Sequence, residues 1–357
     1  MGRRAFLQMA GGWAVGAALA SSGCTPAATQ PGQLNLYNYP NYIAPDTLPD
    51  FEKRFGVRVV YDNYSAQDTL EAKLRIGRFG YDLVVASDYK IRRFWKSGIV
   101  QPLDATRIPN LRNLFSWLRD ASYDPGNRYS VPWQWGTTGI GFNKSYIKET
   151  VESWSILWDS RYRGRIDMLN ERRDCIAVAL LRLGYPVNSV DPRQMREAQN
   201  LLIEQRPLLK HYSSDTYIDE MASDDAWLCE GWSGDVFQAI ADNERVSYVI
   251  PKEGAMRWVD NMCIPAGAPH KDLAEQFMNY VLEPEVSAKI SNAVEFATPN
   301  EAALPFIRED LRDNPLIYPP PPVMERLSFL EDLGPVGDAL WNEVWEQVKL
   351  ARGTSPS

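Results

Sequence analysis

The first third of the chain alternates between two spacings of apolar residues, one typical of strands and one typical of helices. We predict strands at 34–37, 57–61 and 81–86, and helices at 45–55, 67–77 and 89–98. Strands and helices that alternate in this way form a parallel sheet covered by helices on both faces. Because ligands of such sheets bind beyond the carboxyl ends of the strands, a site is expected near residues 38–39, 63–65 and 87–89.

The middle third repeats this pattern and adds two longer extended segments. We predict strands at 165–169, 226–229 and 246–250, and helices at 173–183 and 235–243. The extended segments near 133–142 and 258–264 are expected to pass between two halves of the molecule. Crossing strands of that kind would form a hinge.

The N-terminus has the features of an export signal. Arg3 and Arg4 precede an apolar run of small residues that leads to Cys24. The run is shorter than the roughly 20 residues that a membrane span needs, so residues 1–24 are predicted to be a twin-arginine signal of the lipoprotein type. Cys24 would then carry the lipid, and the alternative is ordinary cleavage nearby. Residues 25–33 are small and polar and are predicted to be a flexible tether.

Composition limits the classes of function that the chain can serve. About 325 residues remain after the signal, which is more than one core usually serves and favours two lobes. The net charge is −8 without a basic run, and this argues against nucleic-acid binding. The odd set of later cysteines lacks CxxC spacing, which argues against a structural zinc site and a disulfide framework but leaves one bridge open. These cysteines are Cys175, Cys229 and Cys263. With only two histidines, His211 and His270, a His-based triad or His-rich metal site has little to draw on.

Several long stretches carry a resemblance to a known family. They include LYNYPNYIAPDTLPDFEKRFGVRVVY, YSVPWQWGTTGIGFN, GWSGDVFQA and IPKEGAMRWVDNMCIPAGAPHK. From Leu34 to about Arg352, the chain resembles the spermidine/putrescine-binding component of bacterial polyamine ABC importers. The resemblance implies an α/β fold of the two-lobed periplasmic-binding-protein type (type II-like). Each lobe would be a mainly parallel sheet flanked by helices, and crossing strands would form the hinge.

The same resemblance implies the domain organisation and the partners. Residues 34–138 and about 259–304 would form the first lobe, and 139–258 and about 305–353 the second. The protein would be an extracytoplasmic monomer that delivers its ligand to the membrane permease subunits of an ABC importer. It would be attached to the membrane only through its lipid. The resemblance implies no catalysis, cofactor, bound metal or nucleic-acid partner.

A polyamine is a flexible alkyl chain with two to four ammonium groups, and this chemistry predicts its binding site. Carboxylates accept charge-assisted hydrogen bonds from the ammonium groups, and aromatic faces cover the methylenes and add cation–π attraction. The residues that the resemblance places at the ligand are Tyr39, Tyr42, Ser87, Tyr89, Glu171, Asp174, Trp232, Asp235, Trp258, Asp260 and Phe296. The sequence departs from the family at Asn41, which replaces an acid, at Phe296, which replaces a common Tyr, and at Leu330, which replaces a polar amide.

Each of these residues also has a structural interpretation. The tyrosines could pack locally in a turn, the tryptophans could fill the core, and Asp235 could cap a helix. Glu171 and Asp174 could belong to a solvated helix start, which the helix dipole favours. For Asp88, which follows Ser87, helix capping is favoured over ligand contact.

Three functions compete at this point. The first is a binding protein for spermidine and putrescine, and the number of acids predicts tighter binding of spermidine. The second is a binder of another cationic amine or of ferric iron, although tryptophan walls are unusual for an iron site. The third is a secreted hydrolase, but the stretch GWSGD departs from the GxSxG pattern because Asp235 replaces its final glycine.

Overall fold

A computed structural model describes residues 32–64, 66–77 and 80–351. The predicted export signal, with Arg3, Arg4 and Cys24, lies outside these residues, as does most of the predicted tether. Within the described part of the chain, no helix combines the length and the apolar character that crossing a bilayer requires.

The first third of the chain forms the predicted β-α-β-α-β-α unit. Its elements are β1 (Gln33–Asn38), α1 (Thr47–Phe55), β2 (Arg58–Asn63), α2 (Gln67–Ile76), β3 (Leu83–Ser87) and α3 (Asp88–Lys96). Strand β1 pairs in parallel with both β2 and β3, so the carboxyl ends of all three strands lie at one edge. Helix α1 ends where predicted, because Gly56 adopts a left-handed conformation (φ 67°) that stops the helix.

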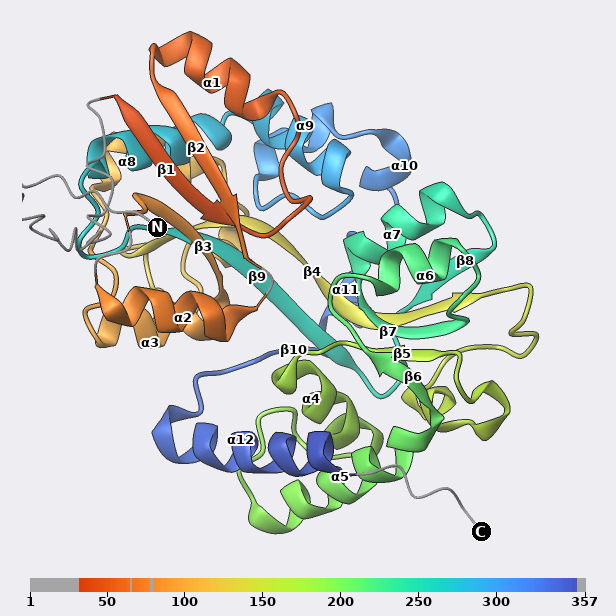
Figure 1. Ribbon diagram of the computed structural model, residues 1–357. Helices are drawn as coiled ribbons and strands as arrows, with labels where there is room; N and C mark the ends of the chain where they lie inside the picture. The colour runs from red at the N-terminus through yellow and green to blue at the C-terminus, as the bar shows by residue number, and fades with distance from the viewer. Residues whose placement is uncertain (1–31, 65, 78–79, 352–357) are drawn as a thin grey trace, which may run out of the picture.

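Two long strands connect the two halves of the molecule, as the extended segments predicted. They are β4 (Ser130–Asn143) and β9 (Ala255–Cys263), which run side by side through the centre of Figure 1. Strand β9 pairs with β3 on one side, and the far end of β4 pairs with two strands of the second half. The strand order is β2-β1-β3-β9-β4-β7-β5-β6, so one continuous path of hydrogen bonds joins both halves.

The second half of the sheet is partly parallel. Its strands are β5 (Ile166–Met168), β6 (Leu209–Tyr212), β7 (Leu228–Trp232) and β8 (Val246–Val249). Strand β5 pairs in parallel with β6 and β7, whereas β7 and β8 run antiparallel to the crossing strand β4. The sequence did not predict β6, which is the edge strand and is only half-buried along its whole length.

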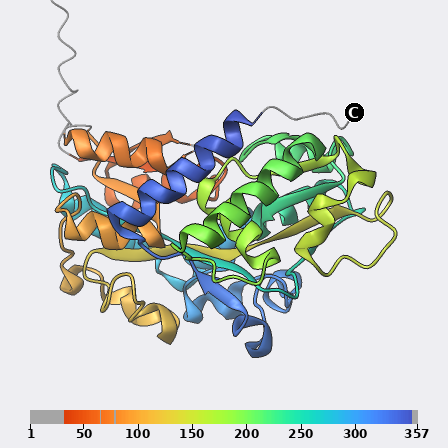
Figure 2. The same ribbon diagram turned by 90° about the horizontal axis from the view of Figure 1, so that it is seen from below.

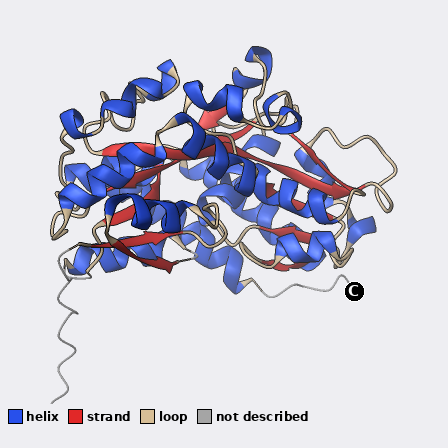
Figure 3. Cartoon of the chain, turned by 90° about the horizontal axis from the view of Figure 1, so that it is seen from above, coloured by secondary structure: helices blue, strands red, loops and turns tan. Residues whose placement is uncertain are grey.

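Helices lie on both sides of the strands (Figure 3). The remaining elements are α4 (Arg172–Arg182), α5 (Pro192–Gln205), α6 (Tyr217–Ala222), α7 (Ser233–Asp242), α8 (Lys271–Val281), α9 (Pro284–Val294), α10 (Glu309–Arg312), α11 (Pro321–Met324), β10 (Leu327–Phe329) and α12 (Gly334–Leu350). Short 3-10 segments occur at 105–107, 109–113, 116–118, 154–158, 160–162, 206–208 and 301–306.

The last helix lies along both halves, as Figure 2 shows for α12 in dark blue. Trp341 of α12 is fully buried in a core that this helix shares with α4 and α5. On its other side, Asp338 forms an ion pair with Arg93 of α3 in the first half. A larger hydrophobic core extends through the rest of the molecule. The two halves thus meet along the crossing strands and along α12.

Candidate ligand-binding site

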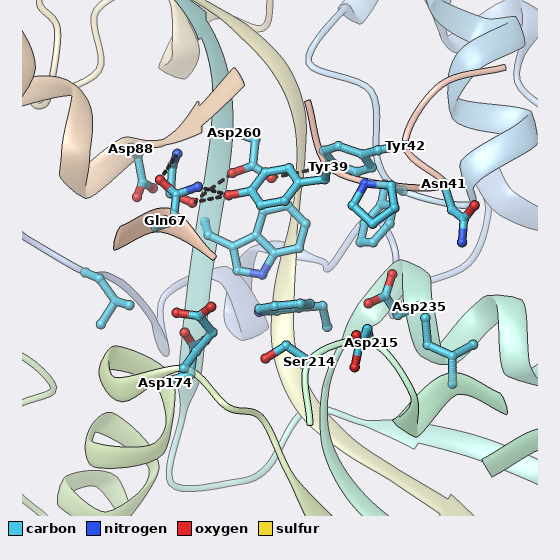
Figure 4. A pocket seen from close by; sticks show the side chains of 18 of the residues that line it. Tyr39, Asn41, Tyr42, Gln67, Asp88, Asp174, Ser214, Asp215, Asp235 and Asp260 are labelled. Carbon is cyan, nitrogen blue, oxygen red and sulfur yellow. Dashed lines mark hydrogen bonds between the residues drawn. The ribbon is translucent and has the colours of Figure 1, made fainter. Parts of the chain in front are cut away.

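A pocket lies between the two halves, beside the crossing strands (Figure 4). All 11 residues that the sequence placed at a ligand line this pocket, although they come from six separate stretches of the chain. The other lining residues are Pro40, Asn41, Gln67, Asp88, Ser214, Asp215, Ile218 and Leu330. The structure therefore brings the predicted residues together, and their contact with a ligand stays a prediction.

Asp260 is the acid of the first half, and hydroxyl groups hold it in place. It lies on β9 opposite Ser87 of β3. Ser87 Oγ donates to its Oδ1 at 2.9 Å, and Tyr42 Oη donates to its Oδ2 at 2.9 Å. Burial raises the pKa of Asp260 to about 6 in spite of these two donors. Both oxygens keep a free lone pair, so the carboxylate is oriented without being saturated.

A hydrogen-bonded group of side chains surrounds Asp260. Tyr39 Oη lies 3.2 Å from Ser87 Oγ, and Gln67 Nε2 donates to Tyr39 and to Tyr64. Tyr39 and Tyr42 meet edge to face, with ring centroids 5.6 Å apart. The aromatic pair after β1 is therefore fixed by contacts to its neighbours and not by local turn packing alone.

Two acids of the second half lie at the beginning of α4. Glu171 is the residue before the helix, and Asp174 lies in its first turn. Thr138 of β4 donates its hydroxyl to Asp174 Oδ1 at 2.9 Å. Burial raises the pKa of Asp174 to about 6, and burial together with the nearby Asp174 raises that of Glu171 to about 8. Asp174 is therefore buried in the pocket and Glu171 is half-buried there, so this helix start is not fully solvated.

Asp235 occupies a similar position in the first turn of α7. Tyr217 Oη donates to its Oδ2 at 2.7 Å, and burial raises the pKa of Asp235 to about 7. Figure 4 shows Asp174 on one side of the pocket and Asp235 with Asp215 on the other, while Asp260 lies above them. The carboxylates are therefore spread along the pocket, which suits a ligand with separated charges.

Aromatic rings lie against these acids. Phe296 contacts Tyr42 and Trp258 edge to face, with ring centroids 5.1 and 5.4 Å apart. Trp232 precedes α7 and, like Trp258, is only partly buried although it packs on the core. The tryptophans therefore present part of their surface to the pocket, which a purely structural role would not require. Leu330 adds an apolar contact at the position where a polar amide is usual in the resembling family.

Asp88 is a tether between two elements. It is the first residue of α3 and is 1% exposed. One carboxylate oxygen accepts the N–H of Tyr89 at 2.6 Å, and the other accepts the N–H of Val259 at 3.1 Å. The N-cap position of α3 is Ser87, so the prediction that Asp88 caps the helix is wrong in position. Asp88 instead binds the first turn of α3 and fixes this helix to the crossing strand β9.

The sequence missed one lining segment, which contains Ser214, Asp215 and Ile218. This segment follows β6, so the rule that ligands bind beyond strand ends would have found it. The strand itself was not predicted, because LKHY carries neither an apolar run nor a clear alternation. Gln67 was missed for a different reason, since a glutamine at a helix start carries no specific signal.

The charged side chains that line the pocket are all acidic among the described residues. Its lining includes six carboxylates, from Asp88, Glu171, Asp174, Asp215, Asp235 and Asp260, and no lysine or arginine among the described residues. Ionised carboxylates removed from water are costly unless a cation accompanies them. Such a pocket attracts an elongated cation with several charges and an apolar chain.

The cysteines do not contribute to this site. Cys175, Cys229 and Cys263 are buried free thiols in the structure, so none of them forms the disulfide that the sequence left open. The pocket residues that the structure describes also include neither histidine. His211 lies beside Asp167 and Glu220, and His270 lies beside Asp82.

Comparison with known proteins places this pocket in a family context. Residues 47–318 match the model of the bacterial extracellular solute-binding protein family. The putrescine-binding periplasmic protein PotF of Escherichia coli K12 is 37% identical, and the alignment covers 96% of this chain and 97% of PotF.

Solved structures share the two-lobed fold. The spermidine/putrescine ABC transporter substrate-binding protein PotD of Streptococcus pneumoniae superposes with a TM-score of 0.78 at 29% identity, covering 89% of this chain and 99% of PotD. The Tp0655 (TpPotD) lipoprotein of Treponema pallidum superposes with a TM-score of 0.81 at 30% identity, covering 88% of this chain and 99% of that protein.

Proposed function

The chain belongs to the bacterial extracellular solute-binding protein family, and we propose that it captures a polyamine, such as spermidine or putrescine, for an ABC importer. The observation that carries the proposal is the lining of the pocket, with six carboxylates, several aromatic rings and no described lysine or arginine. Ammonium groups would pair with the carboxylates, and the rings would cover the methylenes between them.

The position of the acids supports a linear ligand. Asp260 is held on β9 by two hydroxyl donors, while Asp174 and Asp235 begin two different helices of the second half. A compact cation could pair with only one of these positions at a time. A chain with two or three ammonium groups can reach more than one, and this favours a polyamine over a monoamine.

Closure of the two halves is part of the proposed mechanism. Residues of both halves line the pocket, so neither half alone can enclose the chain. We propose that the first lobe consists of residues 34–138 and about 259–304, and the second of 139–258 and about 305–353. The boundaries at 138/139 and 258/259 fall within the crossing strands β4 and β9, where a change of backbone angle would rotate one half against the other.

Two other functions receive less support. Ferric iron prefers clustered Tyr, His and carboxylate ligands, and the described lining has no histidine and is rich in tryptophan and apolar surface. A hydrolase with Ser233 as nucleophile would need a neighbouring base. Ser233 Oγ instead lies 3.3 Å from the N–H of Thr137, as its acceptor, and His211 and His270 belong to other clusters.

A titration with a panel of amines tests the proposal. Isothermal calorimetry with spermidine, putrescine and the monoamine butylamine should give one binding site for each polyamine and much weaker binding of the monoamine. Absence of heat with every polyamine would overturn the proposal. Binding of butylamine as tightly as putrescine would replace it with a general amine binder.

Placement of the protein is a separate proposal. Arg3, Arg4 and Cys24 suggest export by the twin-arginine route, followed by lipidation of Cys24 and attachment to the outer face of a membrane. There the protein would act as a monomer and present its ligand to the membrane permease subunits. A variant with both Arg3→Lys and Arg4→Lys should remain in the cytoplasm, and normal export of that variant would exclude the twin-arginine route.

A further inference from the structure

A second group of polar side chains lies in the second half, and none of them lines the ligand pocket. Asp167 lies on β5, His211 on the neighbouring strand β6, and Glu220 on α6. One nitrogen or oxygen atom of each side chain can be chosen so that all three atoms lie within 4.8 Å of one another. Two carboxylates and one imidazole, each from a different element, thus lie close together.

Asp167 is the most unusual member of this cluster. It is fully buried, at 0% exposure, and neither of its carboxylate oxygens has a hydrogen-bond partner among the described residues. A buried carboxylate without a hydrogen bond is strongly unfavourable, because it loses its hydration and gains no partner in return. Its surroundings must therefore supply a proton or a cation.

Few positively charged groups lie near Asp167 in the described chain. His211 Nε2 lies 3.6 Å from Asp167 Oδ1 and 3.0 Å from Glu220 Oε2. Lys210 Nζ lies 2.9 Å from the same Glu220 Oε2 and forms an ion pair with that carboxylate. Cys229 is the partner of Asp167 on β7, and its buried thiol carries no positive charge. No lysine or arginine of the described chain forms an ion pair with Asp167, and His211 pairs with it only when the imidazole is protonated.

We propose that Asp167, His211 and Glu220 bind one divalent transition-metal ion, with Zn²⁺ as the representative. An imidazole nitrogen and two carboxylate oxygens are ligands that Zn²⁺ accepts, and three protein ligands leave a position for water. Hard ions such as Mg²⁺ prefer oxygen ligands alone and should bind more weakly. No local pattern indicates this site, because the three ligands are 44 and 9 residues apart and only the pairing of β5 with β6 brings them together.

The position of the ion would connect it to the ligand pocket. His211 and Glu220 flank the segment that carries the pocket residues Ser214, Asp215 and Ile218. An ion bound to both flanks and to β5 would hold this segment against the sheet. The site would therefore stabilise one wall of the pocket without touching the ligand.

The test uses the chain's two histidines as a matched pair. The full protein is dialysed against a chelator, and ZnCl₂ is then titrated by calorimetry into the wild type, His211→Gln and His270→Gln. His270 also lies near a carboxylate, but Asp82 already accepts three hydrogen bonds, and no third metal-ligating side chain of the described chain joins this pair. We expect one Zn²⁺ per wild-type and His270→Gln molecule, and binding at least about tenfold weaker for His211→Gln.

Further measurements distinguish a metal site from an ordinary ion-paired cluster. Zn²⁺ should raise the Tm of the wild type and of His270→Gln, and this shift should be lost in His211→Gln and in Asp167→Asn. Wild-type protein that binds no Zn²⁺, or His211→Gln that binds it equally well, would overturn the proposal. Spermidine titrations on the same variants keep the two proposals separate, because the metal site can fail while polyamine binding persists.

Discussion

The two walls of the ligand pocket, one from each half of the molecule, contribute different kinds of side chain. The first half contributes the fixed tyrosines and a single free acid, Asp260, which two hydroxyl groups orient on a strand. The second half contributes charge, and its acids Glu171, Asp174 and Asp235 lie at the beginnings of helices. A helix N-terminus favours a carboxylate even before a ligand arrives. The first wall therefore orients one carboxylate, and the second provides most of the negative charge, so a polycation needs contacts with both.

The largest effect should come from the acid of the first wall. Asp260→Asn preserves size and removes the charge, and loss of one partner of a desolvated ion pair costs about 2–5 kcal/mol. We expect calorimetry to show spermidine binding at least about tenfold weaker, with little loss of stability. Asp174→Asn tests the second wall in the same way and should cost less, because neighbouring acids remain there.

Asp242→Asn is the matched control for both changes. It alters the net charge equally at an exposed position near the end of α7, outside the pocket. If neither Asp260→Asn nor Asp174→Asn differed from this control, the ligand would have to bind elsewhere.

The fit between the two walls can be disturbed without changing any charge. Gly234 of α7 lies so close to Phe296 that an added Cβ would be 2.4 Å from the ring. Overpacking of this kind typically costs about 1–3 kcal/mol. Gly234→Ala should therefore weaken spermidine binding by roughly tenfold and reduce the ligand-induced compaction seen by small-angle scattering.

A second substitution tells whether this contact is the cause. Phe296→Ala in the Gly234→Ala background removes the clash and should recover part of the affinity, which a double-mutant cycle measures. Gly267→Ala is the control, because its nearest neighbouring atom is 3.4 Å away. Equal affinity of Gly234→Ala and wild type would mean that the walls do not need this close approach.

The acids of both walls should make the stability of the protein depend on pH. Burial raises the pKa of Asp260 to about 6, of Asp235 to about 7 and of Glu171 to about 8, whereas these groups titrate near 4 in an unfolded chain. The folded protein therefore binds more protons between about pH 4 and 8, so these groups make the ligand-free protein less stable as pH rises through that window.

A polycation removes this penalty because it stabilises the ionised carboxylates. Thermal denaturation with and without spermidine should show a larger increase in Tm at pH 7.5 than at pH 5. The combined variant Glu171→Gln and Asp235→Asn should lose most of the difference between the two pH values. An equal increase at both pH values in the wild type would contradict the assignment of these acids to the ligand.

Most of the fold and of this pocket could be predicted because their signals are local. The apolar run of β3 and the helical spacing of α1 follow from neighbouring residues, and strand ends then indicate the site. The edge strand β6 carries no such signal, so Asp215 was missed. The two hydroxyl donors to Asp260 and the meeting of Asp167 with His211 depend on strand pairing, which one sequence does not specify.

The smallest expected effect is the ranking of spermidine against putrescine. Spermidine carries three ammonium groups and putrescine two, and the pocket offers Asp260, Asp235 and the pair Glu171–Asp174 at separate positions. A bound diamine would leave at least one of these positions without a cation, so a carboxylate would have to take up a proton or keep water.

Phe296 and Leu330 oppose the preference for spermidine, because they provide no polar contact to fix a longer chain. We therefore expect both polyamines to bind, with spermidine tighter by less than about tenfold, because a carboxylate left without an ammonium group can take up a proton at little cost when burial has already raised its pKa to about 7, as for Asp235. Competition calorimetry measures the ratio directly. The preference should shrink in Asp235→Asn if this acid holds the third ammonium, and putrescine binding at least tenfold tighter than spermidine would reverse the ranking.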